Sequence, residues 1–367
     1  MAQWNRVPLI DYIELIGGGT PKTTVPEYWN GNIPWLSVKD FNNDKRYVYS
    51  TEKHISQSGF ENSPTKMLHK DDIIISARGT VGEIAMIPFD MAFNQSCYGI
   101  RASRGIDQPF LYYLLKNCIS QLKRMTHGSV FDTITRDTFA NIEVDIPDAE
   151  TQKRISSVLA DIDNKIEVND AINDNLQQQA QAIYSSMFID NPDPAWSHGH
   201  LSDLITVKYG KDHKKLADGI YPVYGSGGIM RHVERPLYNK ESVLIPRKGT
   251  LNNVVYVNQP FWSVDTMFYT EMKLPNVAKF VYHFVKAKDL AAMNAGSAVP
   301  SMTTDILNAM EVVIPSASAL EEFESLVAPM YEAMKANDVQ SQALSKMRDA
   351  LLPKLMSGEI DVSAVRL

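Results

Sequence analysis

The sequence has only two cysteines, Cys97 and Cys118, and they do not form a CxxC pair. This pattern excludes a disulfide framework and is typical of a protein of the reducing cytoplasm. The chain also lacks a signal peptide and any apolar run of about 18 residues, so we expect neither export nor a membrane span. The sequence therefore predicts a cytoplasmic protein without membrane contact.

Patterns that are typical of catalytic sites are also missing. Residues 225–228 read GSGG but lack the GxxxxGK[ST] pattern of a phosphate loop, so ATP hydrolysis is not expected here. No Asn-Pro-Pro-aromatic run of an amino-methyltransferase occurs, and the Asn-Pro-Asp-Pro stretch 191–194 is typical of a linker. His198 and His200 have no third metal ligand nearby, and the spacing of Asp265 from residues 271–273 is too short for a metal-dependent nuclease. We predict no catalytic residue, no metal site and no cofactor bound to this chain.

An excess of positive charge is absent as well, since the formal net charge is −7. The acidity is concentrated in two segments: 150–190 carries −4 and 319–367 carries −3, whereas 1–149 carries −2 and 191–318 carries +2. The near-neutral segments are compatible with DNA reading, but they lack the charge for strong phosphate binding by themselves. We therefore expect a partner that supplies basic surface.

The two acidic segments have the apolar pattern of long helices. Residues 150–188 contain neither proline nor glycine, and their apolar positions step by four and three. The same pattern returns 168 residues later, and such a seam needs a partner helix. An antiparallel coiled coil treats both copies alike and brings Asn169 opposite Asn337, as a pair that fixes the register; the alternative is that both asparagines face solvent. The expected seam residues are Ile162, Ile166, Leu176, Ile183, Met330, Met334, Leu344 and Leu351.

Local signals place the ends of these helices. Asp148 is the expected N-cap of the first helix, and Ser318 with Glu321 fits a capping box for the second. Pro329 is expected to kink the second helix or to begin a new helical segment. Each helix should be about 55–60 Å long, which corresponds to about 16–17 base pairs of DNA.

The segments that precede the two helices are copies of one another. The stretch 128–147 recurs at 296–315, 73–84 recurs at 243–254, and Trp4 recurs as Trp196. This duplication predicts an α+β fold with two tandem similar domains separated by two long helices. The expected boundaries are 1–147 for the first domain, 148–190 for the central helix, 191–315 for the second domain and 316–367 for the C-terminal helix.

Short basic and glycine-containing loops in each copy are the candidate DNA contacts. In both copies a basic residue, a glycine and a threonine follow a buried strand, and arginine or lysine in such a turn can reach guanine in the major groove. The alternative is a turn that the fold itself requires. A glycine loop in the first copy is replaced by a lysine-rich loop in the second, and His127–Ser129 and Gly296-Ser297 are further loop candidates, with a helix C-cap as their alternative. The candidates are Thr20, Lys22, Thr24, Lys39, Asp40, Arg78, Gly79, Thr80, Lys208, Tyr209, Lys211, Lys214, Lys248, Gly249 and Thr250.

Several longer motifs resemble those of the specificity subunit of Type I restriction–modification enzymes. They are GGGTPKTTVPEYWNGNIPWLSVKDF at 17–41, SARGTVGEIA at 76–85, FNQSCYGI at 93–100, GSVFDTIT at 128–135, IEVDIP at 142–147 and LLPKLMSGEI at 351–360. The resemblance covers essentially the whole chain. The second copy departs from it with PRKGTLNN at 246–253 and WSVDTMF at 262–268, which suggests two different half-sites.

The resemblance implies a non-catalytic subunit that reads a bipartite sequence in double-stranded DNA. It implies two methyltransferase subunits docked on the paired helices, with restriction and translocase subunits as further partners. S-adenosylmethionine, ATP and Mg²⁺ are then expected on those partners only. The competing hypothesis from the residues is a coiled-coil adaptor whose two domains bind protein.

Overall fold

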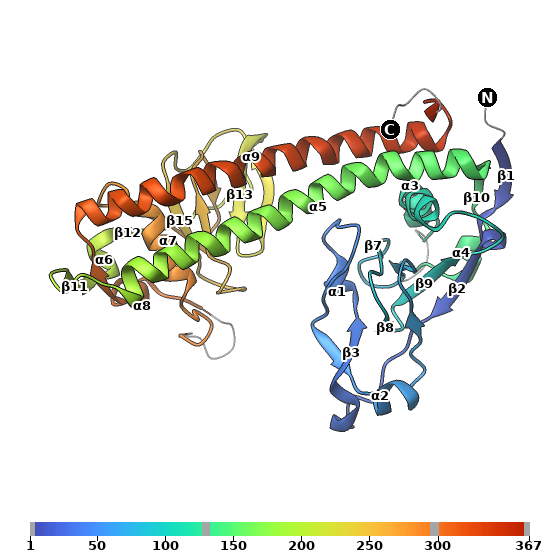
Figure 1. The fold of residues 1–367 in the computed structure, drawn as a ribbon, viewed down its shortest axis with the longest axis horizontal. Coiled ribbons are helices and arrows are strands. Elements are labelled where there is room, and N and C mark those ends of the chain that lie inside the picture. Colours follow the sequence, from blue (N-terminus) through green and yellow to red (C-terminus); the bar gives the residue numbers. More distant parts are fainter. Residues whose placement is uncertain (1–3, 127–132, 294–300, 363–367) are drawn as a thin grey trace. The chain divides into compact units, whose positions relative to one another are not determined.

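The computed structural model describes residues 4–126, 133–293 and 301–362. It divides into two compact units, Met1–Ala171 with Asn337–Leu367 and Ile172–Ala336. Each unit contains one head, built from short strands and helices, and one half of each of two long helices (Figure 1). Among the described residues, no helix is both long and apolar enough to cross a bilayer.

The head of the first unit is built on two four-stranded sheets and one two-stranded ladder. The first sheet has the order β2-β9-β6-β7, the second β4-β3-β8-β5, and β1 pairs antiparallel with β10. The strands are β1 (Trp4–Pro8), β2 (Ile13–Gly17), β3 (Trp29–Leu36), β4 (Lys53–Ile55), β5 (Met67–Leu68), β6 (Ile73–Ser76), β7 (Ile84–Met86), β8 (Met91–Phe93), β9 (Cys97–Ala102) and β10 (Glu143–Pro147). The helices are η1 (Leu9–Tyr12), η2 (Pro26–Tyr28), α1 (Val38–Phe41), α2 (Gln57–Glu61), α3 (Gln108–Thr126) and α4 (Arg136–Ala140).

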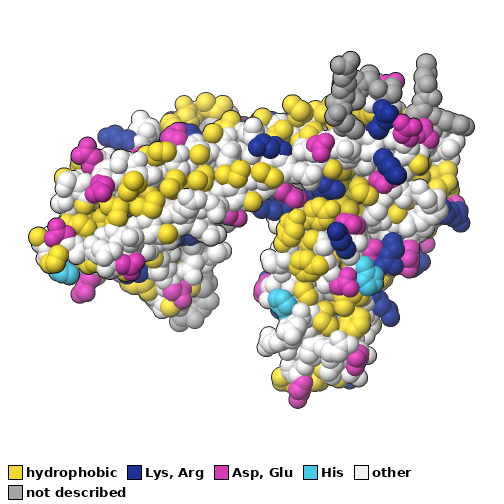
Figure 2. Space-filling model, viewed as in Figure 1, with side chains coloured by type: hydrophobic (Ala, Val, Ile, Leu, Met, Phe, Trp, Pro, Cys, Tyr) yellow, Lys and Arg dark blue, Asp and Glu magenta, His cyan; other side chains and the backbone are white. Residues whose placement is uncertain are grey.

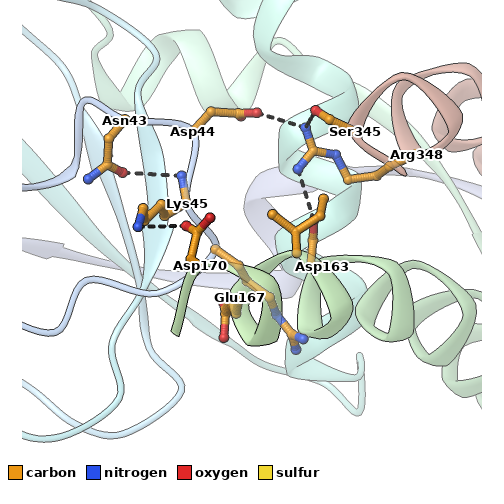
Figure 3. A pocket seen from close by; sticks show the side chains of 10 residues that line it. Asn43, Asp44, Lys45, Asp163, Glu167, Asp170, Ser345 and Arg348 are labelled. Atoms are coloured by element: carbon orange, nitrogen blue, oxygen red, sulfur yellow. Dashed lines mark hydrogen bonds and ion pairs between the residues drawn. The ribbon is translucent and has the colours of Figure 1, made fainter. Parts of the chain in front are cut away.

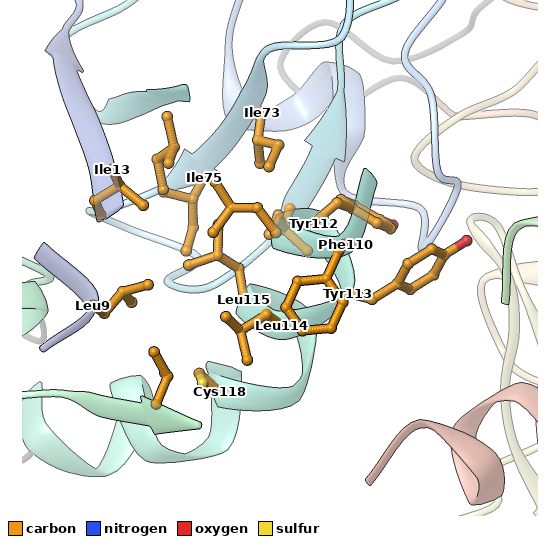
Figure 4. Close-up of a cluster of buried hydrophobic side chains, with 14 of the residues drawn as sticks. Leu9, Ile13, Ile73, Ile75, Phe110, Tyr112, Tyr113, Leu114, Leu115 and Cys118 are labelled. Carbon is orange, nitrogen blue, oxygen red and sulfur yellow. The ribbon is translucent and has the colours of Figure 1, made fainter. Parts of the chain in front are cut away.

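The core of this head lies between α3 and the β2-β9-β6-β7 sheet. Strand β6 is buried along its whole length, which explains its unbroken β-branched run of isoleucines. Ile73 and Ile75 lie in one buried cluster with Phe110 and Leu115 of α3 (Figure 4). This packing holds the end of β6, and therefore the turn that follows it, on a rigid base.

The second unit repeats this architecture, with one strand fewer in its second sheet. Its sheets have the orders β12-β18-β15-β16 and β14-β13-β17, and β11 pairs with β19. The strands are β11 (Ser197–His200), β12 (Ile205–Tyr209), β13 (Asp218–Gly225), β14 (Gly228–Val233), β15 (Ser242–Pro246), β16 (Val255–Val257), β17 (Trp262–Ser263), β18 (Met267–Met272) and β19 (Glu311–Ile314). The helices are α6 (Leu201–Leu204), α7 (Ala278–Lys286) and α8 (Thr304–Asn308). The duplication read from the sequence is thus confirmed at the level of strand order.

Two long helices complete the units, α5 (Ala149–Ser185) and α9 (Ala317–Met356), and η3 (Ser186–Asp190) continues α5 as a π-helical turn. Asp148 caps α5 as expected, because its carboxylate accepts from the Thr151 backbone N–H at 2.9 Å. The expected capping box of Ser318 is wrong. Helix α9 begins at Ala317, before Ser318, and the Ser316 hydroxyl accepts from the backbone N–H of Ala319.

Proline does not interrupt the second long helix. Pro329 and Pro353 both lie inside α9, so the expectation that Pro329 begins a new helical segment is wrong. Pro329 is exposed, whereas Val327 and Tyr331 on either side are buried. Water can therefore bond the carbonyl that proline leaves free, while the packed side chains hold the helix together.

The two long helices pair antiparallel, as predicted. In the first unit Asp163 of α5 contacts Arg348 of α9, and the Asn169 amide donates to Gln340 Oε1 at 2.9 Å. In the second unit Asn173 donates to the carbonyl of Met334, and Tyr184 packs on Phe323. As the residue numbers rise along α5, the residue numbers of their partners on α9 decrease, which is the pattern of an antiparallel pair. Figure 1 shows the two ribbons side by side.

The asparagine pairing differs in detail from the prediction. Asn169 is fully buried and contacts the backbone carbonyl of Asn337 at 3.4 Å, with Gln340 and Ser341 as its closer side-chain partners. The alternative that Asn169 faces solvent is therefore wrong. The other predicted seam residues are all partly buried on the two helices: Ile162, Ile166, Leu176, Ile183, Met330, Met334, Leu344 and Leu351.

Candidate nucleic-acid interface

The turn after β6 presents Arg78, Gly79 and Thr80 to solvent. The backbone N–H groups of Ala77 and Arg78 both donate to the Ser96 carbonyl, at 2.8 and 3.2 Å. Gly79 has φ +78° and no atom within 4 Å of where a Cβ would stand, so glycine serves the backbone conformation here and not the space around it. The turn is fixed by backbone bonds, and the side chains of Arg78 and Thr80 are exposed.

The turn after β15 repeats these bonds 170 residues later. The N–H groups of Arg247 and Lys248 donate to the Thr266 carbonyl, also at 2.8 and 3.2 Å, and Gly249 has φ +86°. The fold therefore requires the glycine in both copies, in agreement with the alternative that this turn is structural. It does not require a cation, because no backbone bond of the turn depends on the side chain of Arg78 or Lys248.

The glycine loop of the first unit is packed against the neighbouring strands. A Cβ on Gly18 would stand 2.1 Å from the Asn94 carbonyl oxygen, and one on Gly19 would stand 2.4 Å from the Thr65 nitrogen. The Trp35 indole donates to the Gly19 carbonyl at 3.0 Å. Thr20 follows with its hydroxyl bonded to Gln95, and Lys22 and Thr24 are exposed.

The lysine-rich loop of the second unit occupies the equivalent place. Gly210 replaces Gly18, because a Cβ there would stand 2.0 Å from the Val264 carbonyl oxygen. Lys211 replaces Gly19: its N–H donates to the Ser263 carbonyl, and its own carbonyl accepts from the Trp262 indole at 2.8 Å. Lys211 and Lys214 are exposed. The positional match expected from the sequence is thus borne out by the backbone contacts.

Four of the candidate DNA contacts of the first unit line one groove of about 350 Å³. The groove brings the turn after β6 together with α1 and the start of β4, which are distant in the sequence. Its lining residues are Trp35, Ser37, Val38, Lys39, Glu52, Lys53, Arg78, Gly79, Thr80, Asn94 and Ser96. Thr20, Lys22 and Thr24 are not among them. Lys53 and Glu52 were missed because a short strand with one lysine has no distinctive pattern.

Asp40 has a structural task inside this site. Its carboxylate accepts from the backbone N–H of Ser37 at 2.7 Å and from that of Glu52 at 2.8 Å. It closes a capping box on α1 and ties α1 to the start of β4. Asp40 therefore positions Lys39 and Lys53, and its oxygens already have partners.

The loop between α1 and β4 is anchored to the long helices in the first unit. The Arg348 guanidinium bonds Asp163 at 2.8 Å and Asp44 at 2.7 Å, and Lys45 pairs with Asp170 at 2.8 Å (Figure 3). Burial alone would raise the pKa of Asp44, but Lys116 and Arg348 outweigh it and hold that pKa below its usual range. The loop that joins Lys39 on α1 to Lys53 on β4 is thus held to the long helices by ion pairs.

In the second unit an aromatic contact lies beside the turn after β15. The Arg247 guanidinium lies over the Tyr209 ring at 5.3 Å and donates to the Asp265 carbonyl. Tyr209 is 52% exposed, and its ring also packs against Phe268 at 5.1 Å. Lys208 pairs with Glu271 at 3.7 Å on the same sheet, and Lys248, Gly249 and Thr250 are exposed. Arg247 was not among the candidates, because only the position of Lys248 matches that of Arg78.

Two of the loop candidates, His127–Ser129 and Gly296-Ser297, lie outside the described residues. Of the described residues, Ile134 donates its backbone N–H to the Ala77 carbonyl, and Met302 donates its own to the Arg247 carbonyl. Among the described residues, no group of three or more His, Cys, Asp or Glu side chains is arranged to hold a metal ion.

Comparison with known proteins identifies the family. The model of the Type I restriction modification DNA specificity domain matches residues 1–178 and 195–322. The MjaIX specificity subunit of Methanocaldococcus jannaschii is 26% identical over 98% of this chain and 94% of its own length. The EcoprrI specificity subunit of Escherichia coli is 22% identical over 90% of each chain. The crystal structure of a Type I restriction–modification S subunit from M. genitalium has the same fold, with a TM-score of 0.58 at 17% identity over 97% of this chain and 96% of that one. The chain therefore belongs to the family of Type I restriction–modification specificity subunits, which are the non-catalytic components of these enzymes.

Proposed function

We propose that this chain reads a bipartite DNA sequence, with one half-site for each head, and positions methyltransferase subunits over an adenine in each half-site. The observation that carries the proposal is the repeated turn. Arg78 and Lys248 occupy equivalent backbone positions with equivalent bonds, and both side chains are exposed. A fixed backbone with a free cationic side chain is suited to contact a phosphate or the edge of a guanine.

The surroundings of the two turns support different half-sites. The turn of the first unit borders a groove with Lys39, Glu52 and Lys53, whereas the turn of the second borders the aromatic contact of Tyr209 with Arg247. Polar and apolar groups select different base edges in the major groove. The heads thus share a docking geometry and differ in what they read.

The paired helices are the proposed site for the partner subunits. Among their exposed apolar side chains are Val168 at 49%, Val339 at 62% and Met347 at 53% in the first unit, and Ile172 at 41% and Leu326 at 47% in the second. Figure 2 shows hydrophobic side chains along the outer faces of the long helices. Such apolar area needs a covering partner. Two methyltransferase subunits, and restriction or translocase subunits beyond them, fit this role; S-adenosylmethionine, ATP and Mg²⁺ would bind to those partners.

The remaining boundaries and contacts stay proposals. The domains 1–147, 148–190, 191–315 and 316–367 are offered as functional divisions. Thr20, Lys22 and Thr24, which lie outside the groove, are offered as phosphate or base contacts to DNA. The chain would act in the cytoplasm, where its DNA target is accessible. A coiled-coil adaptor that binds protein through its heads remains the competing function; such an adaptor with its methyltransferase would not leave a sequence-specific methylation pattern.

The test is single-molecule sequencing of DNA from cells that express this chain with its methyltransferase. We expect one bipartite methylated motif. Arg78→Ala should relax or abolish recognition of one half-site, and Lys248→Ala should do the same for the other, at a cost of about 1–3 kcal/mol each for a base contact.

Lys70→Ala is the matched control, because Lys70 is an exposed lysine of the first head that does not line the groove. It should leave the motif unchanged. The proposal fails if Arg78→Ala and Lys248→Ala, both folded, alter the same half-site, or if methylation follows no sequence.

A further inference from the structure

The β13–β14 hairpin of the second unit carries two exposed apolar side chains near its tip. Ile229 is 51% exposed and Met230 is 60% exposed. The register of the hairpin changes at this point: Val223 pairs with Arg231 and Tyr224 with Ile229, so Met230 is an extra residue on β14. Such a bulge twists the strand and changes the direction of its side chains.

The tip of this hairpin lies against the turn after β15. A Cβ on Gly249 would stand 2.7 Å from Ser226 Oγ, and Asn253 Nδ2 donates to the Ser226 carbonyl at 2.8 Å. Behind the tip, Arg231 donates to the Leu216 carbonyl at 3.0 Å, next to the lysine-rich loop. The hairpin that carries the apolar pair therefore contacts the turn after β15 at its tip and the end of the lysine-rich loop through Arg231.

Gly225 leaves the space that the Met230 side chain occupies on the hairpin. A Cβ on Gly225 would stand 2.6 Å from Met230 Sδ, so the thioether lies directly over the glycine. A side chain at position 225 would displace it. This glycine, the first of the GSGG stretch, gives Met230 a defined place.

The first head has charged groups at the same register. Trp35 pairs with Lys53 in the antiparallel ladder and with Ala92 in the parallel one, just as Val223 pairs with Arg231 and with Trp262. Lys53 is thus equivalent to Arg231, and Glu52 precedes Lys53 in the chain as Met230 precedes Arg231. The residue before this shared cation is a carboxylate in the first head and an apolar methionine in the second.

We propose that Ile229 and Met230 contact the 5-methyl group of a thymine in the half-site that the second head reads. This inference rests on the proposed function and specifies its chemistry. In the major groove the thymine methyl is the apolar feature of the base edges, and apolar side chains recognise it. The hairpin that carries Ile229 and Met230 contacts the turn of Lys248 and the end of the lysine-rich loop, which are the proposed DNA-reading segments of this head.

Deoxyuridine tests the proposal, because it differs from thymidine only by that methyl group. The protein is the complete complex with its methyltransferase, and the probe is its own methylated motif as a duplex. Each thymidine is replaced in turn by deoxyuridine, and Kd is measured. We expect at least one replacement in the half-site that Lys248→Ala affects to weaken binding by about three- to five-fold, the effect of removing one methyl group from an apolar contact.

The double variant Ile229→Ser/Met230→Ser should bind the thymidine and deoxyuridine duplexes equally at that position. Its response to deoxyuridine in the other half-site should stay as in the wild type. Ile220→Ser is the matched control: Ile220 is 78% exposed on β13 of the same head and away from the tip, so this variant should keep the wild-type discrimination.

Three results separate the possible failures. If no replacement in that half-site changes Kd, or if the double variant keeps the discrimination, the inference is overturned while the proposed function stands. If the double variant instead loses its methyltransferase subunit, the apolar pair belongs to a protein interface and the inference is likewise overturned. If the wild-type complex does not distinguish its motif from a duplex with scrambled half-sites, the proposed function itself fails.

Discussion

Tyr113 and His283 occupy equivalent positions in the two heads and make equivalent contacts with the long helices. The Tyr113 hydroxyl donates to Asp163 at 2.7 Å, and His283 Nε2 lies 2.9 Å from the Tyr331 hydroxyl. Asp163 and Tyr331 are 168 residues apart, the spacing of the repeat. Because Gln181 Oε1 can only accept, the proton of His283 sits on Nδ1, and Nε2 accepts from Tyr331. Both heads thus have a buried hydrogen bond to a long helix at this position, but the two residues that form it differ between the heads.

The pH dependence of stability should follow from His283. Burial lowers its pKa from 6.5 to about 4, because the charged imidazolium is disfavoured there. The unfolded chain therefore binds more protons than the folded one between these values. The contribution to the free energy of unfolding is complete above the unfolded pKa of 6.5 and is lost as the pH falls toward 4.

His283→Gln should reduce this loss, since glutamine can donate to Gln181 and accept from Tyr331 without titrating. We expect the slope of unfolding free energy against pH to fall by up to about 1.4 kcal/mol per pH unit between pH 4.5 and pH 6. Urea denaturation across that range measures it. His69→Gln, at an exposed position, is the control. Identical slopes for wild type and His283→Gln would contradict the assignment.

Among the secondary-structure elements, α9 departs most from what its pattern indicated. Arg348 is the one charged residue in its apolar seam, yet it is only 3% exposed and joins α9 to α5 through Asp163 and to the head through Asp44. Burial by itself would lower the pKa of Arg348, but Asp163 and Asp44 outweigh burial and raise that pKa above its usual value. A heptad pattern cannot show this, because both acidic partners come from other elements.

Arg348→Met tests the ionic contact between the helices. The variant leaves the Asp163 carboxylate buried with Tyr113 as its hydrogen-bond donor, and we expect a loss of about 3–5 kcal/mol in the free energy of unfolding. The double variant Arg348→Met/Asp163→Asn should recover part of that loss, because no buried charge then remains unpaired. Chemical denaturation of the four proteins of the cycle measures the coupling.

Lys346→Met is the matched control on the same helix, since Lys346 is exposed. It should change stability by less than about 0.5 kcal/mol. Equal losses for Arg348→Met and Lys346→Met would show that the buried pair holds nothing together.

For the whole molecule, both long helices contribute to both units. Residues up to Ala171 of α5 belong to the first unit and those from Ile172 onward to the second, and α9 is divided at Ala336. A local break in either helix should therefore affect any surface that is built from the pair. Leu176, partly buried on α5 and shortly after this boundary, is a suitable position to test it.

Leu176→Pro should prevent assembly with the methyltransferase. Proline in a helix interior costs about 3 kcal/mol or more, and here no compensating core surrounds it. Leu176→Ala removes the same apolar side chain but preserves the helix, so this variant should assemble with the methyltransferase. Size-exclusion chromatography of the co-expressed subunits distinguishes them. Normal assembly of Leu176→Pro would refute docking on the helix pair.

The sequence by itself determined the duplication, the two long helices, their antiparallel pairing and the family. These follow from periodicity and from repeated motifs, which record the local geometry of each segment directly. It also located the turns of Arg78 and Lys248, because a glycine at positive φ leaves a visible mark in both copies.

Only the tertiary structure decided which side chains meet. It brought Lys39 and Lys53 to the turn of Arg78, assigned Asp40 to a cap, and made Arg348 an ion-pair centre. It also showed that Lys53 and Arg231 share one register position, preceded by Glu52 in one head and by Met230 in the other. The reason is physical: strand pairing joins residues far apart in the chain, and no local pattern specifies which distant side chain will lie opposite.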